Sequence, residues 1–107
     1  MQLLIDAIFN ESLNIDQLRA WLEAAPVQLG FQAINPAIVI WHDPVLVGQI
    51  LLAESHINVH LIPHLHRGFI DIFTCGALDN DKILELLKEF NFEDIKITII
   101  ERGLEYQ

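Results

Sequence analysis

Cysteine is nearly absent from this sequence, which contains one, Cys75, among its 107 residues. A single cysteine excludes an intramolecular disulfide, and we expect Cys75 to remain a reduced thiol. Long apolar runs are also absent. No segment approaches the roughly 20 apolar residues that a membrane-spanning helix needs, and the first ten residues have no basic flank. We therefore expect a cytoplasmic protein that does not enter a membrane.

Basic residues are scarce as well. Six lysines and arginines face 15 aspartates and glutamates, which gives a formal net charge of −9. This charge opposes binding to a phosphate backbone, so we expect no nucleic-acid ligand and favour a small cationic partner. Hydrophobic residues make up 52% of the chain. A domain of this size buries only about 60 to 70% of its unfolded surface, so we predict a homodimer or a higher homo-oligomer.

Two stretches have the apolar spacing of a helix. The first begins after Asn14, with Gln17 as its capping-box partner, and we expect Pro26 to end it. The second follows the capping cluster Asp79-Asn80-Asp81, which can cap its first turn. Their apolar stripes consist of Ile15, Leu18, Leu22 and Ala25 in the first helix and Ile83, Leu86, Leu87 and Phe90 in the second.

The remaining apolar segments have the length and composition of strands. On the segment from His56 onward, alternate residues point to opposite faces, with a polar side that carries His56, Asn58 and His60. No repeat or linker divides residues 1–107, so we predict one domain, an α+β two-layer sandwich with a mostly antiparallel sheet and two helices on one face. The predicted strands are Gln2 to Phe9, Ile34 to Trp41, Val45 to Ala53, the segment from His56, Phe69 to Thr74, and Ile95 to Ile100, with turns at 42–44 and 54–55.

The almost continuous apolar run from Val45 to Ala53 has a further implication. It predicts a strand that is covered on both faces or lies at a subunit boundary.

Four histidines between positions 56 and 66 raise the question of a metal site. On an extended strand, His56 and His60 lie roughly 13 Å apart, too far to share one ion. His64 and His66 have a suitable spacing, but two ligands are a weak signal, so we predict no metal site. Conventional serine-hydrolase chemistry is equally unsupported, because no nucleophile-elbow glycines surround Ser55.

The most specific motif lies between Leu51 and Gly76, in the segment LLAESHINVHLIPHLHRGFIDIFTCG. It contains Glu54-Ser55-His56, with His60 five residues after the serine and Cys75 twenty after it. This pattern resembles the self-cleavage site of the short prokaryotic S-adenosylmethionine decarboxylases, which are pyruvoyl-dependent enzymes of polyamine biosynthesis. The resemblance implies the S-adenosylmethionine decarboxylase-like fold and a homodimer with its sites at the interface.

The resemblance also implies self-cleavage between Glu54 and Ser55, into a β chain of residues 1–54 and an α chain of residues 55–107. The Ser55 hydroxyl attacks the Glu54 carbonyl carbon, and elimination from the resulting ester leaves a dehydroalanine that hydrolyses to a pyruvoyl group. This group forms a Schiff base with the substrate amine and accepts the electrons released with carbon dioxide. The pyruvoyl group takes the electron-accepting role that pyridoxal phosphate has in other decarboxylases. The resemblance therefore implies no pyridoxal phosphate and no metal.

Residue roles follow from the same resemblance. His60 assists the elimination, Cys75 donates a proton during decarboxylation, and Glu54 becomes the carboxyl residue of the β chain. Trp41 corresponds to one of the family's two stacking aromatics, and Asp6 lies in a segment that resembles its opening strand. The candidate substrate-binding residues are Asp6, Trp41, Ile62 and His64.

Three positions depart from the family pattern. Ile62 replaces the second stacking aromatic, a tryptophan, while His64 replaces a glutamate and Val47 a hydroxyl residue that assists processing. Losing one stack costs a nucleobase about 1 to 3 kcal/mol. The default substrate is S-adenosylmethionine, and L-ornithine or L-arginine is the alternative. The change at Val47 leaves a second alternative, an unprocessed binding or regulatory homologue.

Overall fold

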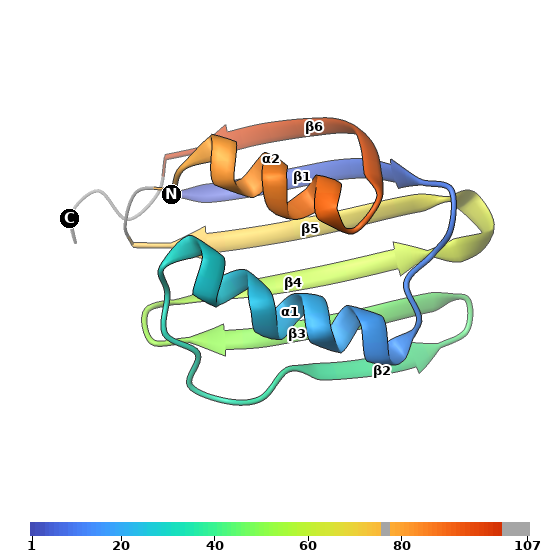
Figure 1. The fold of residues 1–107 in the computed structure, drawn as a ribbon, viewed down its shortest axis with the longest axis horizontal. Helices are drawn as coiled ribbons and strands as arrows, with labels where there is room; N and C mark the ends of the chain where they lie inside the picture. Colours follow the sequence, from blue (N-terminus) through green and yellow to red (C-terminus); the bar gives the residue numbers. More distant parts are fainter. Residues whose placement is uncertain (76–77, 102–107) are drawn as a thin grey trace.

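The computed structural model describes residues 1–75 and 78–101. Within these ranges a six-stranded sheet forms one layer and two helices form the other (Figure 1). This confirms the predicted α+β sandwich. The elements are β1 (Gln2–Phe9), α1 (Ile15–Leu29), β2 (Ile38–His42), β3 (Val45–Leu52), β4 (Ser55–Ile62), the 3-10 turn η1 (Pro63–Leu65), β5 (Arg67–Thr74), α2 (Asn80–Glu89) and β6 (Phe92–Ile100).

All neighbouring strands of the sheet are antiparallel, in the order β2-β3-β4-β5-β1-β6. Strands β2 to β5 follow one another through short connections, and β1 lies between β5 and β6. Both helices cover the same face of the sheet (Figure 1). We call the other face, which no described helix covers, the open face.

Burial alternates along the strands as the sequence pattern predicts. On β4, Ile57, Val59 and Leu61 are fully buried under the helices, while His60 is exposed on the open face. The same alternation holds on β3, where Leu51 is 43% exposed on the open face. Within residues 1–75 and 78–101, therefore, only one face of β3 is covered. The alternative expectation, a subunit boundary, remains a prediction.

Helix α1 begins as predicted and ends later. The side chain of Asn14 accepts a hydrogen bond from the Gln17 N–H at 2.8 Å, and the Gln17 side chain accepts one from the Asn14 N–H at 2.9 Å. The expectation that Pro26 ends the helix is wrong, because α1 continues to Leu29. Pro26 is buried, and its carbonyl accepts a hydrogen bond from Phe31 at 2.8 Å. Gly30, in the left-handed conformation with φ 80°, closes the helix instead.

Strand β2 is shorter than predicted. It begins at Ile38 rather than Ile34, because Pro36 has no N–H to donate to a ladder. Between α1 and β2, an isolated bridge pairs Ala33 with Leu52.

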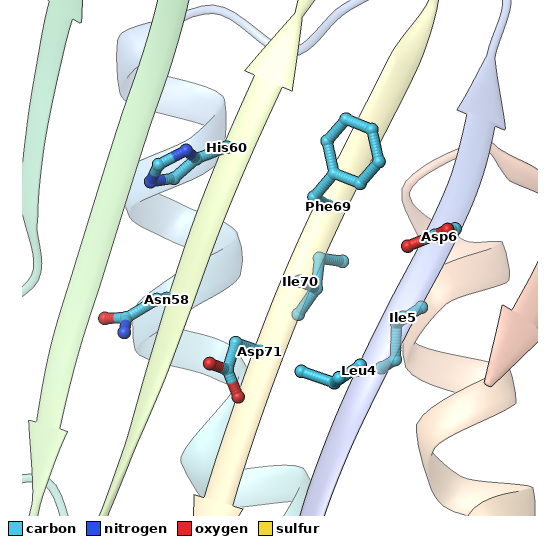
Figure 2. A pocket seen from close by; sticks show the side chains of 8 residues that line it. All are labelled: Leu4, Ile5, Asp6, Asn58, His60, Phe69, Ile70 and Asp71. Carbon is cyan, nitrogen blue, oxygen red and sulfur yellow. The ribbon is translucent and has the colours of Figure 1, made fainter. Parts of the chain in front are cut away.

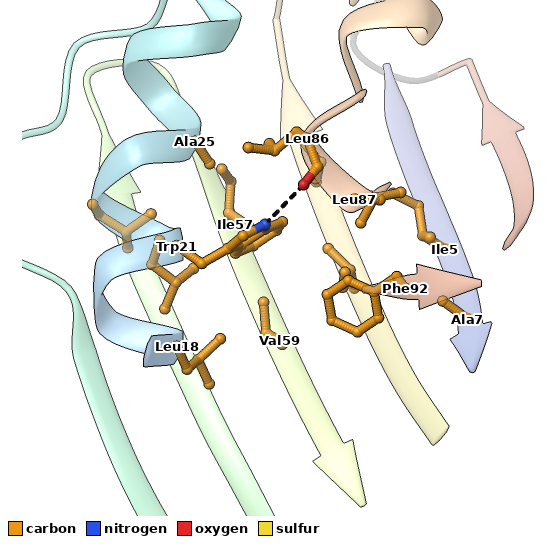
Figure 3. Packing of buried hydrophobic residues seen from close by; sticks show 14 of the residues in the cluster. Ile5, Ala7, Leu18, Trp21, Ala25, Ile57, Val59, Leu86, Leu87 and Phe92 are labelled. Atoms are coloured by element: carbon orange, nitrogen blue, oxygen red, sulfur yellow. Dashed lines mark hydrogen bonds between the residues drawn. The ribbon is translucent and has the colours of Figure 1, made fainter. Parts of the chain in front are cut away.

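Trp21 joins the two helices to the sheet (Figure 3). Its indole Nε1–H donates a hydrogen bond to the Leu86 carbonyl of α2 at 3.3 Å. Its ring meets Phe90 and Phe92 edge-on, with centroids 6.0 and 6.4 Å away. Close packing continues at Gly48 of β3, where a Cβ atom would lie 2.7 Å from a methyl carbon of Leu22.

We predict that Trp21→Phe lowers the free energy of unfolding by about 1 to 3 kcal/mol, since it removes a buried hydrogen bond and ring volume. Urea unfolding measures this change. Gln28→Ala is the control, because Gln28 also connects α1 to α2, through an exposed hydrogen bond to Glu89. The control should stay within about 0.5 kcal/mol of wild type. Equal losses in both variants would contradict a special role for the buried bond.

Candidate functional site

The Glu54–Ser55 peptide bond joins a tight turn to a strand. Strand β3 ends at Leu52 and β4 begins at Ser55, so the turn consists of Ala53 and Glu54, one residue earlier than predicted. Ser55 is half-buried and pairs with Leu52 on one side and Thr74 on the other. Leu52 and Thr74 both point toward the helices, which places the Ser55 side chain on that face.

Cys75 directly follows β5 and reaches the same turn. Its thiol donates a hydrogen bond to the Glu54 carbonyl oxygen, with an Sγ–O distance of 3.6 Å. The structure therefore brings together Glu54, Ser55 and Cys75, as their assignment to one site requires. A cavity of about 220 Å³ adjoins the turn, lined by Phe31, Gln32, Leu52, Ala53, Glu54, Ser55 and Thr74.

His60 does not lie with these residues in one chain. It stands five positions after Ser55 on the continuous strand β4, which corresponds to roughly 16 Å at the usual rise per residue. Because Ser55 and His60 are an odd number of positions apart on the strand, their side chains also point to opposite faces of the sheet. On the open face, His60 lies between Val47 of β3 and Phe69 of β5.

His60 instead lines a cavity of about 360 Å³ on the open face (Figure 2). Two carboxylates, of Asp6 and Asp71, give this cavity a negative character. Gln2 donates hydrogen bonds to both Asp71 carboxylate oxygens, at 2.9 and 3.1 Å. The lining residues are Leu4, Ile5, Asp6, Asn58, His60, Phe69, Ile70 and Asp71.

The cavity suits a cationic ligand. No lysine or arginine is among its lining residues. The nearest cation by register is Lys96 of β6, which stands opposite Asp6 but forms no ion pair with it within the described chain. Asn58 and Asp71 were not predicted as site residues. The sequence pattern could have identified them, because both are polar residues on the strand face that also carries His60.

The other predicted substrate-binding residues are dispersed. Ile62 is half-buried at the end of β4, and His64 is exposed in η1. Trp41 pairs with Leu46, whose side chain is buried under the helices, so Trp41 lies on the face opposite to Asp6. There it lines a separate apolar cavity of about 300 Å³ with Ser12, Leu13, Asn14, Ile15, Leu46 and Pro63.

Two further searches concern metals and membranes. Among residues 1–75 and 78–101, no group of three or more histidine, cysteine, aspartate or glutamate side chains is placed to hold a metal ion. In the same ranges, no helix combines the length and apolarity that a membrane span requires.

The fold has a counterpart among solved structures. An adenosylmethionine decarboxylase from Aquifex aeolicus VF5 superimposes with a TM-score of 0.74, covering 95% of this chain and 92% of that chain at 23% identity. This likeness defines the class of fold. Residues 5–103 match the S-adenosylmethionine decarboxylase family, so the chain belongs to that family.

Individual relatives agree with this assignment. An S-adenosylmethionine decarboxylase proenzyme from Thermococcus kodakarensis is 33% identical over 96 residues, which cover 86% of this chain and 66% of that protein. The proenzyme from Persephonella marina is 30% identical over 97 residues, covering 89% of this chain and 73% of that protein. For the Moorella thermoacetica proenzyme, 37% identity extends over 59 residues, 53% of this chain and 47% of that protein. The chain thus spans less than two thirds of the Thermococcus and Moorella proteins.

Proposed function

We propose that this chain is a pyruvoyl-dependent decarboxylase that cleaves itself between Glu54 and Ser55 and then acts on S-adenosylmethionine. Family membership supports the reaction class. The observation that carries the proposal is the contact between the Cys75 thiol and the Glu54 carbonyl oxygen, at 3.6 Å, beside the serine that would attack that carbonyl. A thiol hydrogen bond to this oxygen favours attack, because it stabilises the negative charge that develops there.

Self-cleavage at this position is compatible with an intact sheet. The cut falls at the end of a two-residue turn, so no strand is broken. Seven register pairs connect β3 to β4, and eight connect β4 to β5. We therefore expect the fragments 1–54 and 55–107 to remain associated after cleavage.

His60 acts, in this proposal, on the Ser55 of a second copy. Within one chain the two side chains lie on opposite faces, roughly 16 Å apart along β4. The open face also exposes large apolar side chains, including Leu4 at 37%, Phe69 at 40% and Leu51 at 43%. A homodimer that seats the β3–β4 turn of one copy against the open face of the other would bury part of this apolar surface and bring Ser55 and His60 of different copies together.

The pyruvoyl group would supply a carbonyl that binds the substrate amine and withdraws electrons as carbon dioxide leaves. The chain's own residues would bind and orient the substrate. Asp6 and Asp71 provide negative charge for a cationic substrate, and Cys75 holds the proton that the product requires.

The choice among cationic substrates depends on the nucleoside subsite. Ile62 offers no aromatic face, and Trp41 lies on the other face of the sheet, so neither stacks over the open-face cavity in one chain. L-ornithine and L-arginine share the amine, the carboxylate and the positive charge, and they need no nucleoside contact. They are therefore the second candidate substrates.

A non-catalytic role is the third candidate. Val47, which replaces the family's hydroxyl residue, is the direct register partner of His60. An unprocessed homologue that binds or regulates a partner enzyme would show neither cleavage nor carbon dioxide release.

We predict that purified wild-type protein yields a fragment ending at Glu54 and a pyruvoyl-blocked fragment starting at position 55, detected by intact mass. Ser55→Ala should remain a single chain because it has no attacking hydroxyl. Cys75→Ala should retain slow cleavage but lose most turnover. Uncleaved wild-type protein, or equal loss of cleavage in both variants, would contradict these roles.

We predict that Val47→Ser speeds self-cleavage, because it places a hydroxyl beside His60. The rate is measured from the time course of precursor loss after synthesis. Gln49→Ser is the matched control, since it lies on the same face of β3 but pairs with Asn58 instead of His60. A similar acceleration in both variants, or in neither, would show that the hydroxyl at position 47 does not limit processing.

We predict that carbon dioxide release is fastest with S-adenosylmethionine when it is compared in parallel with L-ornithine and L-arginine. Ile62→Trp should raise kcat/KM for S-adenosylmethionine by about tenfold to hundredfold by restoring a nucleobase stack. It should leave the two amino acids unaffected. Activity on a basic amino acid alone would reject the S-adenosylmethionine assignment.

A further inference from the structure

The imidazole ring of His56 is stacked, nearly parallel and offset, on the phenyl ring of Phe73. Their centroids are 5.7 Å apart and the ring planes differ by 22°. The two residues stand directly opposite each other in the β4–β5 register, on the open face, and both are half-buried. The other described ring contacts are tilted or edge-on, with interplanar angles of 51° to 88°.

We propose that His56 and Phe73 are a positioning pair, which holds the chain end created by self-cleavage in register with the strand that carries Cys75. The inference rests on the proposed function, because the new chain end exists only after cleavage. Neither residue had a role in the scheme above.

Cleavage removes the covalent restraint on residue 55. In the intact chain, the turn of Ala53 and Glu54 ties Ser55 to β3. After cleavage, residue 55 carries the reactive carbonyl, has no N–H for the ladder and is attached only to the His56 nitrogen. Free chain ends fray unless side chains hold them. Ile57, fully buried, holds this end on the helix side, and His56 is the first residue able to hold it on the open face.

Phe73 connects the same contact to the proton donor. It precedes Cys75 by two residues along the chain, and the Cys75 thiol lies 3.6 Å from the Glu54 carbonyl oxygen at the turn. Along the chain, His56 is therefore one residue from the reactive carbonyl of residue 55, and Phe73 is two residues from the thiol of Cys75. Displacement of a catalytic group by about 1 Å can cost a large fraction of the rate, so this register matters for turnover.

The role assigned to His56 requires its flat ring and no proton transfer. A phenyl ring at position 56 stacks on Phe73 equally well, whereas a methyl group does not. Replacement of Phe73 by leucine keeps apolar bulk against the sheet but removes the flat partner. These substitutions separate positioning from both proton transfer and simple loss of packing.

The test compares His56→Ala, His56→Phe, Phe73→Leu and the double variant of His56→Ala with Phe73→Leu. Intact mass gives the cleaved fraction, and kcat and KM are measured per cleaved site. We expect each of His56→Ala and Phe73→Leu to lower kcat by about 3- to 10-fold with little change in KM, as loss of an aromatic pair predicts. His56→Phe should stay near wild type, and the double variant should be no slower than the slower single variant. His42→Ala, a histidine on the edge strand β2, should match wild type.

Three results would overturn the positioning pair while leaving the proposed function intact. They are unchanged kcat in both single variants, a His56→Phe variant as slow as His56→Ala, and single effects that multiply in the double variant. The last would show that the two rings act independently. A wild-type protein that neither cleaves nor releases carbon dioxide would instead overturn the proposed function and this inference with it.

Discussion

The structure depends on one constraint, which is that both helices cover the same face of the sheet. Because strand residues alternate between faces, burial of Ile57, Val59 and Leu61 under the helices forces His56, Asn58 and His60 onto the open face. The apolar half of each strand provides the folding free energy. The alternate residues, on the open face, include charged, amide and imidazole side chains that a ligand or a second chain can reach.

The same constraint divides the chemistry between two places. Ser55 and Cys75 meet at the β3–β4 turn, and His60 lies with Asp6 and Asp71 in the open-face cavity. No side-chain rotation brings His60 to Ser55, since they project from opposite sides of one continuous strand. A protein that uses both must either assemble from two copies or assign the two places to separate tasks. The apolar side chains exposed on the open face favour assembly.

Much of the fold was predictable from local signals. The capping box at Asn14 and Gln17, the alternation on β4 and the apolar stripe of α2 each depend on residues close together in the chain. The expected end of α1 at Pro26 was wrong, because the position where the helix ends depends on the burial of the proline and on the Gly30 cap. Likewise, the face occupied by Trp41 depends on its pairing with Leu46, and that register is set by a turn whose geometry the sequence does not specify. For the site, the motif predicted one group of Glu54, Ser55 and Cys75, and the fold brings these three residues together at the β3–β4 turn. The odd, five-residue spacing between Ser55 and His60 already implied opposite faces once both lie on one strand.

The hydrogen-bonded ladder would keep this small domain ordered after the proposed cleavage. The proposed cleavage after Glu54 would divide the sheet into β1, β2 and β3 on one fragment and β4, β5 and β6 on the other, yet these strands interleave in the order β2-β3-β4-β5-β1-β6. Each fragment therefore borders the other at three strand pairs, and α1 packs through Trp21 against α2 and β6 of the other fragment. Separation would expose the core, so we expect the two fragments to act as one folding unit. The proposed cut would release the first residue of β4, whose position would then depend on noncovalent contacts at the edge of the turn. In the proposed enzyme, those few contacts would determine where the reactive group lies.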